Sequence, residues 1–174
     1  TIPVVDMRDF HTPEKRGAFM DVVKGALHEV GFFGVTHTGI DQELIKDAFR
    51  AAEEFFALPQ EEKFAIDGQD INNQRGYVSF GREAAKGESN PDCKEFLHIG
   101  RDFSEEKRER YNYWSNRWPR NMDLEGPMKK YRDHLDAYAV DVQHIFSLAL
   151  GEEEDYLDEM HKDGDCLLRV IHYP

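Results

Sequence analysis

Basic side chains gather in and around a glycine-rich stretch between residues 67 and 90, which contains Arg75, Tyr77 and Arg82. A guanidinium group can hold a carboxylate through two parallel hydrogen bonds, and a phenol adds a further donor. Arg75, Tyr77 and Arg82 are therefore candidates for binding a small-molecule substrate that carries a carboxylate. The alternative is that the two arginines form local salt bridges, which contribute little to stability at a surface.

The spacing of cysteine and histidine does not predict a metal site. Cys93 and Cys166 are too few and too far apart for a zinc site or a disulfide framework, so a reducing cytoplasm is the expected compartment. His134 and His144 fall on one predicted helix, but they are nearly three turns apart and too distant to share an ion.

Strand and helix patterns predict a β-α-β beginning. Short apolar runs at Ile2–Val5 and Phe32–Val35 are typical of strands. Between them, Thr12-Pro13 provides an N-cap followed by proline at the first helical position, and Gly31 ends the helix. A second helix begins after Asp41 and carries an apolar stripe as far as Phe56.

The stretch from Asp67 to Asn90 is predicted to be a long, mobile loop, since it contains four glycines and shows no hydrophobic periodicity. Residues 101–122 are polar and aromatic, and their pattern does not predict a particular helix or strand. The other predicted elements are a helical turn at Gln60–Phe64, a strand at Lys94–Gly100, a long helix from Gly126 to Leu150, a short acidic helix at Glu152–His161 and a strand at Leu167–Pro174.

Length and composition predict a globular domain. The 174 residues allow one domain with a real core, and 40% of them are hydrophobic. The 35 acidic and 22 basic residues give a net charge of −13, which argues against binding nucleic acid or an anionic membrane. No run of apolar residues is long enough to span a membrane, and the first residues do not resemble a secretory signal.

Six phrases occur in the order seen in the isopenicillin N synthase-like, 2-oxoglutarate- and Fe(II)-dependent oxygenases. They are IPVVDM, LHEVGFFGVTHTGI, FFALPQEEK, RGYVSFGRE, KEFLHIGRD and LLRVIHYP, and they are distributed over essentially the whole chain. The resemblance implies an α/β fold. Residues 1–174 would form the helical N-terminal region of a double-stranded β-helix (jelly-roll) oxygenase and would end at the first strand of the catalytic jelly roll.

The resemblance also implies a reaction, the oxidation of a small organic molecule with Fe(II), O₂ and 2-oxoglutarate. The family binds iron through His-x-Asp and a later His, which leaves coordination positions open. We expect these ligands beyond Pro174, so this chain by itself should not hold iron in that arrangement. A literal His-x-Asp occurs at His161–Asp163, but it precedes Gly164 at a predicted helix end, and we interpret it as a helix-terminal turn.

Tyr173 is the candidate residue for binding the cosubstrate. In the 2-oxoglutarate-dependent members the matching strand contains Asn-x-Tyr-Pro, and both the Asn and the Tyr reach 2-oxoglutarate; here the Asn position is Ile171. Strand alternation places Arg169, Ile171 and Tyr173 on one face and Val170 and His172 on the other. The alternative role for Tyr173 is packing at the edge of a core.

Two other functions remain open at this stage. One is a non-catalytic folded module whose apolar faces are covered by another chain. The other is an oxidase that, like isopenicillin N synthase, needs no 2-oxoglutarate. Iron content separates an oxygenase from a module, and release of succinate separates the two kinds of enzyme.

Overall fold

The computed structural model describes residues 1–82 and 93–174, which form two compact units. Each unit is assembled from two segments of the chain. The first unit comprises Thr1–Gln42 and Asp133–Gly164, and the second comprises Glu43–Arg132 and Asp165–Pro174. The length of the chain suggested one core, whereas each unit has its own cluster of buried apolar side chains.

The first unit begins with the predicted β-α-β arrangement. Strand β1 (Val4–Asp6) pairs in parallel with β2 (Gly34–Thr36), and the crossover contains α1 (Met7–Phe10) and α2 (Pro13–Glu29). Parallel neighbours require such a crossover, which confirms the interpretation of the sequence. The core of this unit consists of Val5, Met7, Phe10, Phe19, Met20, Val23 and Ile145.

The ends of α2 follow from residue types. Thr12 precedes the helix in an extended conformation, and Pro13 occupies the first helical position, where its missing N–H is not needed. Gly31 adopts a left-handed φ of 82° just after the helix, a conformation that favours glycine. Both ends agree with the prediction.

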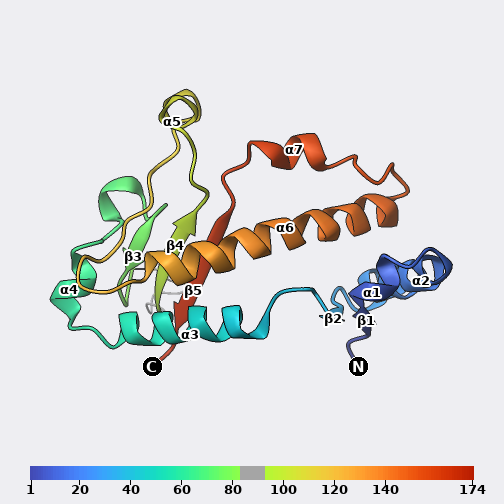
Figure 1. The fold of residues 1–174 in the computed structure, drawn as a ribbon, viewed down its shortest axis with the longest axis horizontal. Coiled ribbons are helices and arrows are strands. Elements are labelled where there is room, and N and C mark those ends of the chain that lie inside the picture. The colour runs from blue at the N-terminus through green and yellow to red at the C-terminus, as the bar shows by residue number, and fades with distance from the viewer. Residues whose placement is uncertain (83–92) are drawn as a thin grey trace. The chain divides into compact units, whose positions relative to one another are not determined.

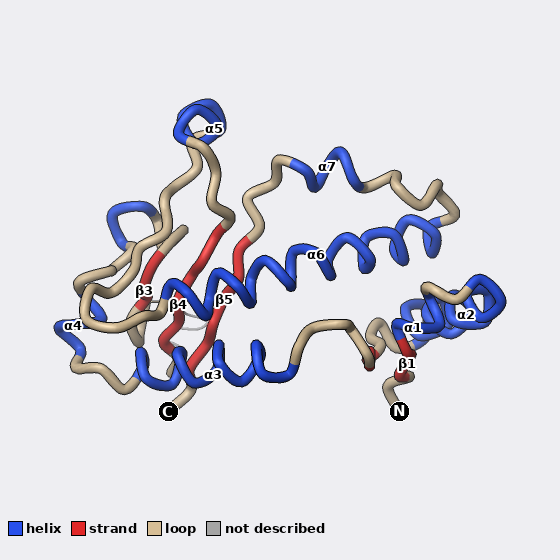
Figure 2. The backbone as a smooth tube through the Cα atoms, in the orientation of Figure 1, coloured by secondary structure: helices blue, strands red, loops and turns tan. Residues whose placement is uncertain are grey.

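The second unit is built on a three-stranded antiparallel sheet in the order β3-β4-β5 (Figure 2). Its strands are β3 (Gly76–Val78), β4 (Glu95–Gly100) and β5 (Leu167–His172). The helices of the chain beyond β2 are α3 (Gln42–Phe56), α4 (Gln60–Phe64), the 3-10 turn η1 (Gln69–Ile71), α5 (Glu105–Tyr111), α6 (Glu125–Leu150) and α7 (Asp158–Lys162).

Helix α3 and the first part of α6 cover one face of this sheet (Figure 1), which we call the helix face. The amphipathic stripe of α3 predicted this burial, since alanines and phenylalanines recur along one side of the helix. The core beneath the two helices consists of Ala48, Ala51, Ala52, Phe55, Phe56, Ile66, Tyr77, Leu97, Ile99, Leu124 and Met128.

Two predicted elements need correction. The stretch from Asp67 to Asn90 is not a loop throughout, because it contains η1 and β3, and Ile71, Tyr77 and Val78 are buried. A three-residue strand is too short to show a periodicity, which explains the error; residues 83–90 of that stretch lie outside the described residues. The acidic helix begins at Asp158 rather than at Glu152, because turns occupy the intervening residues.

Other elements occur where they were predicted, including the long helix α6 and the strands β4 and β5. In the part of the chain that the structure describes, no helix combines the length and hydropathy needed to cross a bilayer.

Candidate functional site

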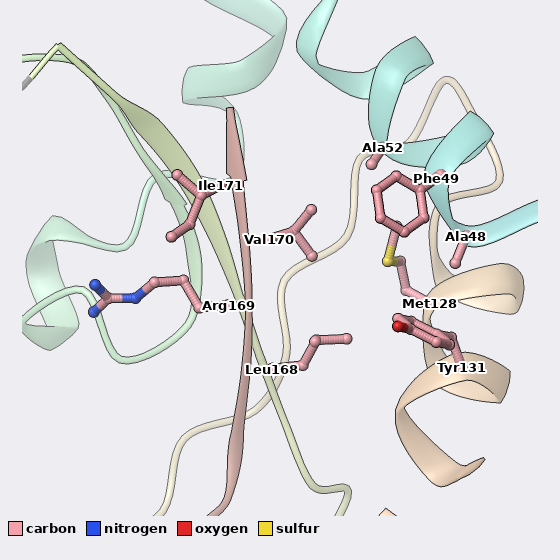
Figure 3. A pocket seen from close by; sticks show the side chains of 9 residues that line it. All are labelled: Ala48, Phe49, Ala52, Met128, Tyr131, Leu168, Arg169, Val170 and Ile171. Carbon is pink, nitrogen blue, oxygen red and sulfur yellow. The ribbon is translucent and has the colours of Figure 1, made fainter. Parts of the chain in front are cut away.

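The two faces of the β3-β4-β5 sheet differ in what they carry. In the antiparallel register Phe96 lies opposite Ile171 and His98 lies opposite Arg169, so these four side chains share the face away from α3 and α6, which we call the far face. Figure 3 shows Arg169 and Ile171 pointing away from the helices and Val170 pointing toward them. The alternation predicted for these residues of β5 is confirmed.

Tyr173 follows the last residue of β5, and continued alternation places it on the far face with Ile171. Its side chain is 62% exposed. Among the described residues no hydrogen bond engages its hydroxyl group. Binding of the cosubstrate by Tyr173 stays a prediction, as does the alternative of packing at the edge of a core.

An ordered guanidinium group lies on the same face. Arg169 Nε donates to His98 Nε2 at 2.6 Å, and His98 Nδ1 in turn donates to the backbone carbonyl of Asn73 at 2.6 Å. This pattern requires the neutral Nδ1–H tautomer of His98. The Arg169 guanidinium also lies 4.5 Å from the centre of the Phe96 ring, a cation–π distance. The far face thus holds a cation in a defined orientation on the strand that leads to Tyr173.

Arg75, a predicted substrate-binding residue, is fully buried at the other end of the sheet. Its guanidinium donates to Asp165 Oδ1 at 2.5 Å and to the Gln74 carbonyl at 2.8 Å. The group lies directly against Gly100, where a Cβ atom would come within 2.1 Å of Arg75 Cζ. Contact between Arg75 and a substrate stays a prediction, and it would require Asp165 to move.

Arg82 forms a two-bond ion pair with Asp67, with N–O distances of 2.7 and 2.5 Å. The hydrogen bonds from Arg82 are the main reason that the pKa of the Asp67 carboxyl is lowered, although burial acts in the opposite direction. This pair is the local salt bridge that the sequence left open as an alternative. A substrate carboxylate would have to compete with Asp67 for Arg82.

Tyr77 lies on the helix face and is fully buried. Its hydroxyl donates to Glu95 Oε2 at 2.5 Å and accepts from Gln60 Nε2 at 3.0 Å. Burial, and then the hydrogen bond to Glu95, raise the pKa of the Tyr77 phenol well above its ordinary value. In this position Tyr77 is one member of a buried polar cluster, and its contact with a substrate remains a prediction.

Glu95 is the centre of that cluster. Lys63 Nζ donates to Glu95 Oε2 at 2.8 Å, and the two side chains are 6% and 2% exposed. His172 Nδ1 donates to the other carboxylate oxygen, Oε1, at 2.9 Å. Burial by itself raises the pKa of Glu95, but the hydrogen bonds from Lys63, Tyr77 and His172 outweigh it and leave the pKa lowered.

We define Lys63, Tyr77, Glu95 and His172 as the Glu95 cluster. Reasoning from the sequence missed it, and the only signal was an acidic residue near the start of the predicted strand KEFLHIG. The structure shows that this strand is buried along its whole length and that Lys63 of α4 is buried as well. A buried carboxylate requires a partner, and Lys63 is that partner.

The His-x-Asp sequence lies where a helix-terminal turn was predicted. His161 is in the last turn of α7, Asp163 is its C-cap residue, and the Gly164 amide donates to the His161 carbonyl at 2.9 Å. The only later histidine, His172, has its ring stacked on Phe56 with a centroid distance of 5.1 Å and its Nδ1 engaged with Glu95. Packing thus accounts for the His172 ring.

A pocket of about 210 Å³ lies on the helix face between β5, α3 and α6 (Figure 3). Nearly all the side chains that line it are apolar, and it offers no carboxylate that could take part in catalysis. We regard it as space within the helix layer rather than as a reaction site. Its lining residues are Ala48, Phe49, Ala52, Met128, Tyr131, Leu168, Arg169, Val170 and Ile171.

Comparison with known proteins agrees with this geometry. Residues 2–121 match the family model described as the N-terminal region of non-haem dioxygenases in morphine synthesis. A 2-oxoglutarate-Fe(II) type oxidoreductase of Aspergillus fumigatus is 30% identical over 99% of this chain and 54% of its own length. Flavonol synthase 1 of Crocosmia x crocosmiiflora is also 30% identical, over 99% of this chain and 49% of its own length.

Solved structures show the same relationship. A 2OG-Fe(II) oxygenase family protein of Caulobacter crescentus superimposes with a TM-score of 0.87 at 30% identity, over 100% of this chain and 56% of its own. A full-length Neurospora crassa protein in complex with alpha-KG gives a TM-score of 0.82 at 26% identity, over 99% and 54% of the two chains. The chain spans about half the length of the relatives it matches. Its α/β fold and its sequence match the N-terminal part of these enzymes, and the chain belongs to the 2-oxoglutarate- and Fe(II)-dependent dioxygenase family.

Proposed function

We propose that the whole protein oxidises a small organic molecule with O₂, using Fe(II) and 2-oxoglutarate, and that this chain contributes one wall of the cosubstrate site. The observation that carries the proposal is the match of residues 2–121 to the family, with Tyr173 at the end of the strand to which the resemblance assigns the cosubstrate site. The structural neighbour from Neurospora crassa binds alpha-KG and thymine, both of which are small molecules.

We further propose that β5 is the first strand of the catalytic jelly roll. It is an edge strand among the described residues, since it pairs only with β4 there, and its far face carries Arg169 and Tyr173. We expect the iron ligands to come from outside this chain, because His161 and Asp163 lie at a helix end and His172 is engaged by Glu95. When bound, iron and 2-oxoglutarate supply the O₂-dependent oxidation.

The residues of the far face suit a dicarboxylate. The Tyr173 hydroxyl can donate a hydrogen bond to a carboxylate, and Arg169 supplies positive charge on the same face of the strand. Ile171, which replaces the Asn of the resembled family, makes the wall between them less polar. A hydrogen bond to a charged group is stronger in such surroundings. The two free cysteines and the family's chemistry are compatible with our placement of the protein in the cytoplasm.

The test of the reaction is the turnover of 2-oxoglutarate by the whole protein. We expect succinate to be released in the presence of Fe(II) and O₂, with one iron bound per chain, and a chelator should abolish the release. Bound iron and O₂ consumption without succinate would favour the oxidase alternative. Absence of iron from protein refolded or purified with Fe(II) would favour the interaction module and would contradict the proposal.

Tyr173→Phe tests the site. Loss of the hydroxyl should weaken cosubstrate binding by about 1–3 kcal/mol, the usual range for a hydrogen bond to a charged group. The 2-oxoglutarate concentration for half-maximal succinate release should therefore rise roughly tenfold to a hundredfold. The fold should survive because the ring is kept. If the variant reaches saturation at the same concentration as the parent, Tyr173 is not a cosubstrate ligand.

A further inference from the structure

The Glu95 cluster ends at the residue that precedes Tyr173. Glu95 and His172 are directly opposite each other and form the last residue pair of the β4–β5 ladder. The side chains of this pair are therefore the ones of the described β4–β5 ladder that lie next to Tyr173 in sequence.

The buried carboxylate of Glu95 holds this pair in place. The Glu95 carboxylate accepts three hydrogen bonds while its side chain is 2% exposed. Lys63 and Tyr77 share one oxygen, Oε2, and Lys63 also neutralises the charge; the other oxygen, Oε1, receives His172. Opening the last pair would thus remove a donor from a buried carboxylate, which is costly.

The His172 ring is held on a second side as well. It stacks on Phe56 of α3 with an interplanar angle of 23° and a centroid distance of 5.1 Å. The hydrogen bond fixes one edge of the imidazole and the stack fixes its plane, so the backbone of residue 172 has one orientation. Because consecutive side chains of a strand point to opposite faces, that orientation sets the direction of Tyr173.

We propose that His172, whose side chain is 40% exposed, is a positioning residue for Tyr173, anchored by the buried Glu95 carboxylate on the helix face and acting on the cosubstrate site on the far face. This inference rests on the proposed function only for its catalytic consequence. The anchoring itself concerns residues of this chain and can be measured without turnover. It assigns a purpose to the ion-paired cluster around Glu95.

The first experiment measures anchoring in the whole protein by hydrogen exchange. His172→Phe keeps a ring for the stack on Phe56 but removes the donor to Glu95. We expect amide exchange in residues 170–174 to accelerate at least tenfold, while exchange in α3 stays at the parent rate. Leu167→Ala, at the exposed other end of the same strand, is the control and should leave residues 170–174 protected. Equal protection in the parent and in His172→Phe would overturn the inference.

The second experiment measures the consequence. His172→Phe should raise the half-saturating concentration of 2-oxoglutarate roughly threefold to tenfold and leave the maximal rate of succinate release within about twofold, since the reacting groups are untouched. In a Tyr173→Phe background the same substitution should have no further effect, because its target is gone. His172→Asn, which keeps an N–H donor near the position of Nδ1, should recover most of the loss.

The possible outcomes distinguish the positioning role of His172 from the proposed function of the whole protein. An additive effect of His172→Phe in the Tyr173→Phe background, or an Asn variant as impaired as the Phe variant, would overturn the positioning role. A parent protein that releases no succinate would contradict the proposed function, whereas the hydrogen-exchange comparison would still decide whether His172 anchors the end of β5.

Discussion

The two faces of strand β5 differ in their contacts and in their exposure. On the helix face, Val170 packs against the core of the second unit and His172 joins the Glu95 cluster. On the far face, Ile171 is 45% exposed and Tyr173 is 62% exposed. Residues one position apart therefore have different surroundings, and substitutions at adjacent positions should have different consequences.

The largest effect should come from breaking the buried ion pair of the helix face. Lys63→Met leaves the Glu95 charge without its cation, and loss of one partner of a buried pair costs about 3–5 kcal/mol. Urea unfolding would measure this loss. The matched control is Lys46→Met, because Lys46 and Glu43 form an exposed pair whose loss should cost less than about 0.5 kcal/mol. Similar losses for the two variants would contradict the contrast between buried and exposed charge.

Asparagine substitutions compare the two faces directly. Val170→Asn places an amide against the apolar core and should reduce the free energy of unfolding by about 2–4 kcal/mol. Ile171→Asn changes an exposed position and should cost less than about 1 kcal/mol. The comparison fails if the Ile171 variant is the less stable of the two.

Substitution of Gly100 tests how closely the Arg75 guanidinium approaches strand β4. In Gly100→Ala the new methyl group would overlap the Arg75 guanidinium, so the arginine must leave its place, at a cost of about 1–3 kcal/mol. Gly25→Ala in α2 is the control, because a Cβ there meets no atom within 4 Å, and alanine should stabilise the helix by about 0.5–1 kcal/mol. Opposite signs in thermal unfolding are the expected result.

The smallest effect is a dependence on pH. The pKa of Glu95 is lower in the folded protein than its ordinary value of about 4.3, so the unfolded chain binds the proton more tightly. The stabilisation is therefore fully present above that ordinary value and is lost as the pH falls through the folded pKa. Comparing parent and Glu95→Gln from pH 6 to pH 3 should show a steeper loss for the parent. Parallel curves would mean that Glu95 does not contribute to acid unfolding.

Elements with a strong period could be predicted from the sequence. The apolar stripe of α3 and the Thr12-Pro13 start of α2 depend only on neighbours along the chain. β3 could not be found, because its three residues become a strand only by pairing with β4. For the same reason the sequence indicated a loop where Tyr77 is buried.

The same distinction between local and non-local properties applies to the residues of the site. Alternation along β5 is a local property, and it correctly separated Arg169 and Ile171 from Val170. The partners of Arg75, Arg82 and Tyr77 are not local. Arg75 pairs with Asp165 across 90 positions and His172 with Glu95 across 77, and residue types do not specify such pairs. Resemblance to the family predicts a role for Tyr173, whereas only the three-dimensional structure shows what holds His172 before it.

Both compact units are discontinuous in sequence, and this has a consequence for synthesis. The first unit takes its second segment from Asp133–Gly164, and the second receives β5 only from residues 165–174. On the ribosome, the buried cluster of the first unit is completed only when Ile145 has been made, whereas the second unit gains the partly buried Leu168 and Val170 of β5 after its buried cluster exists. At about 5–20 residues per second, Val23 waits roughly 6–25 s for Ile145. We expect chaperones to bind the nascent chain during this interval.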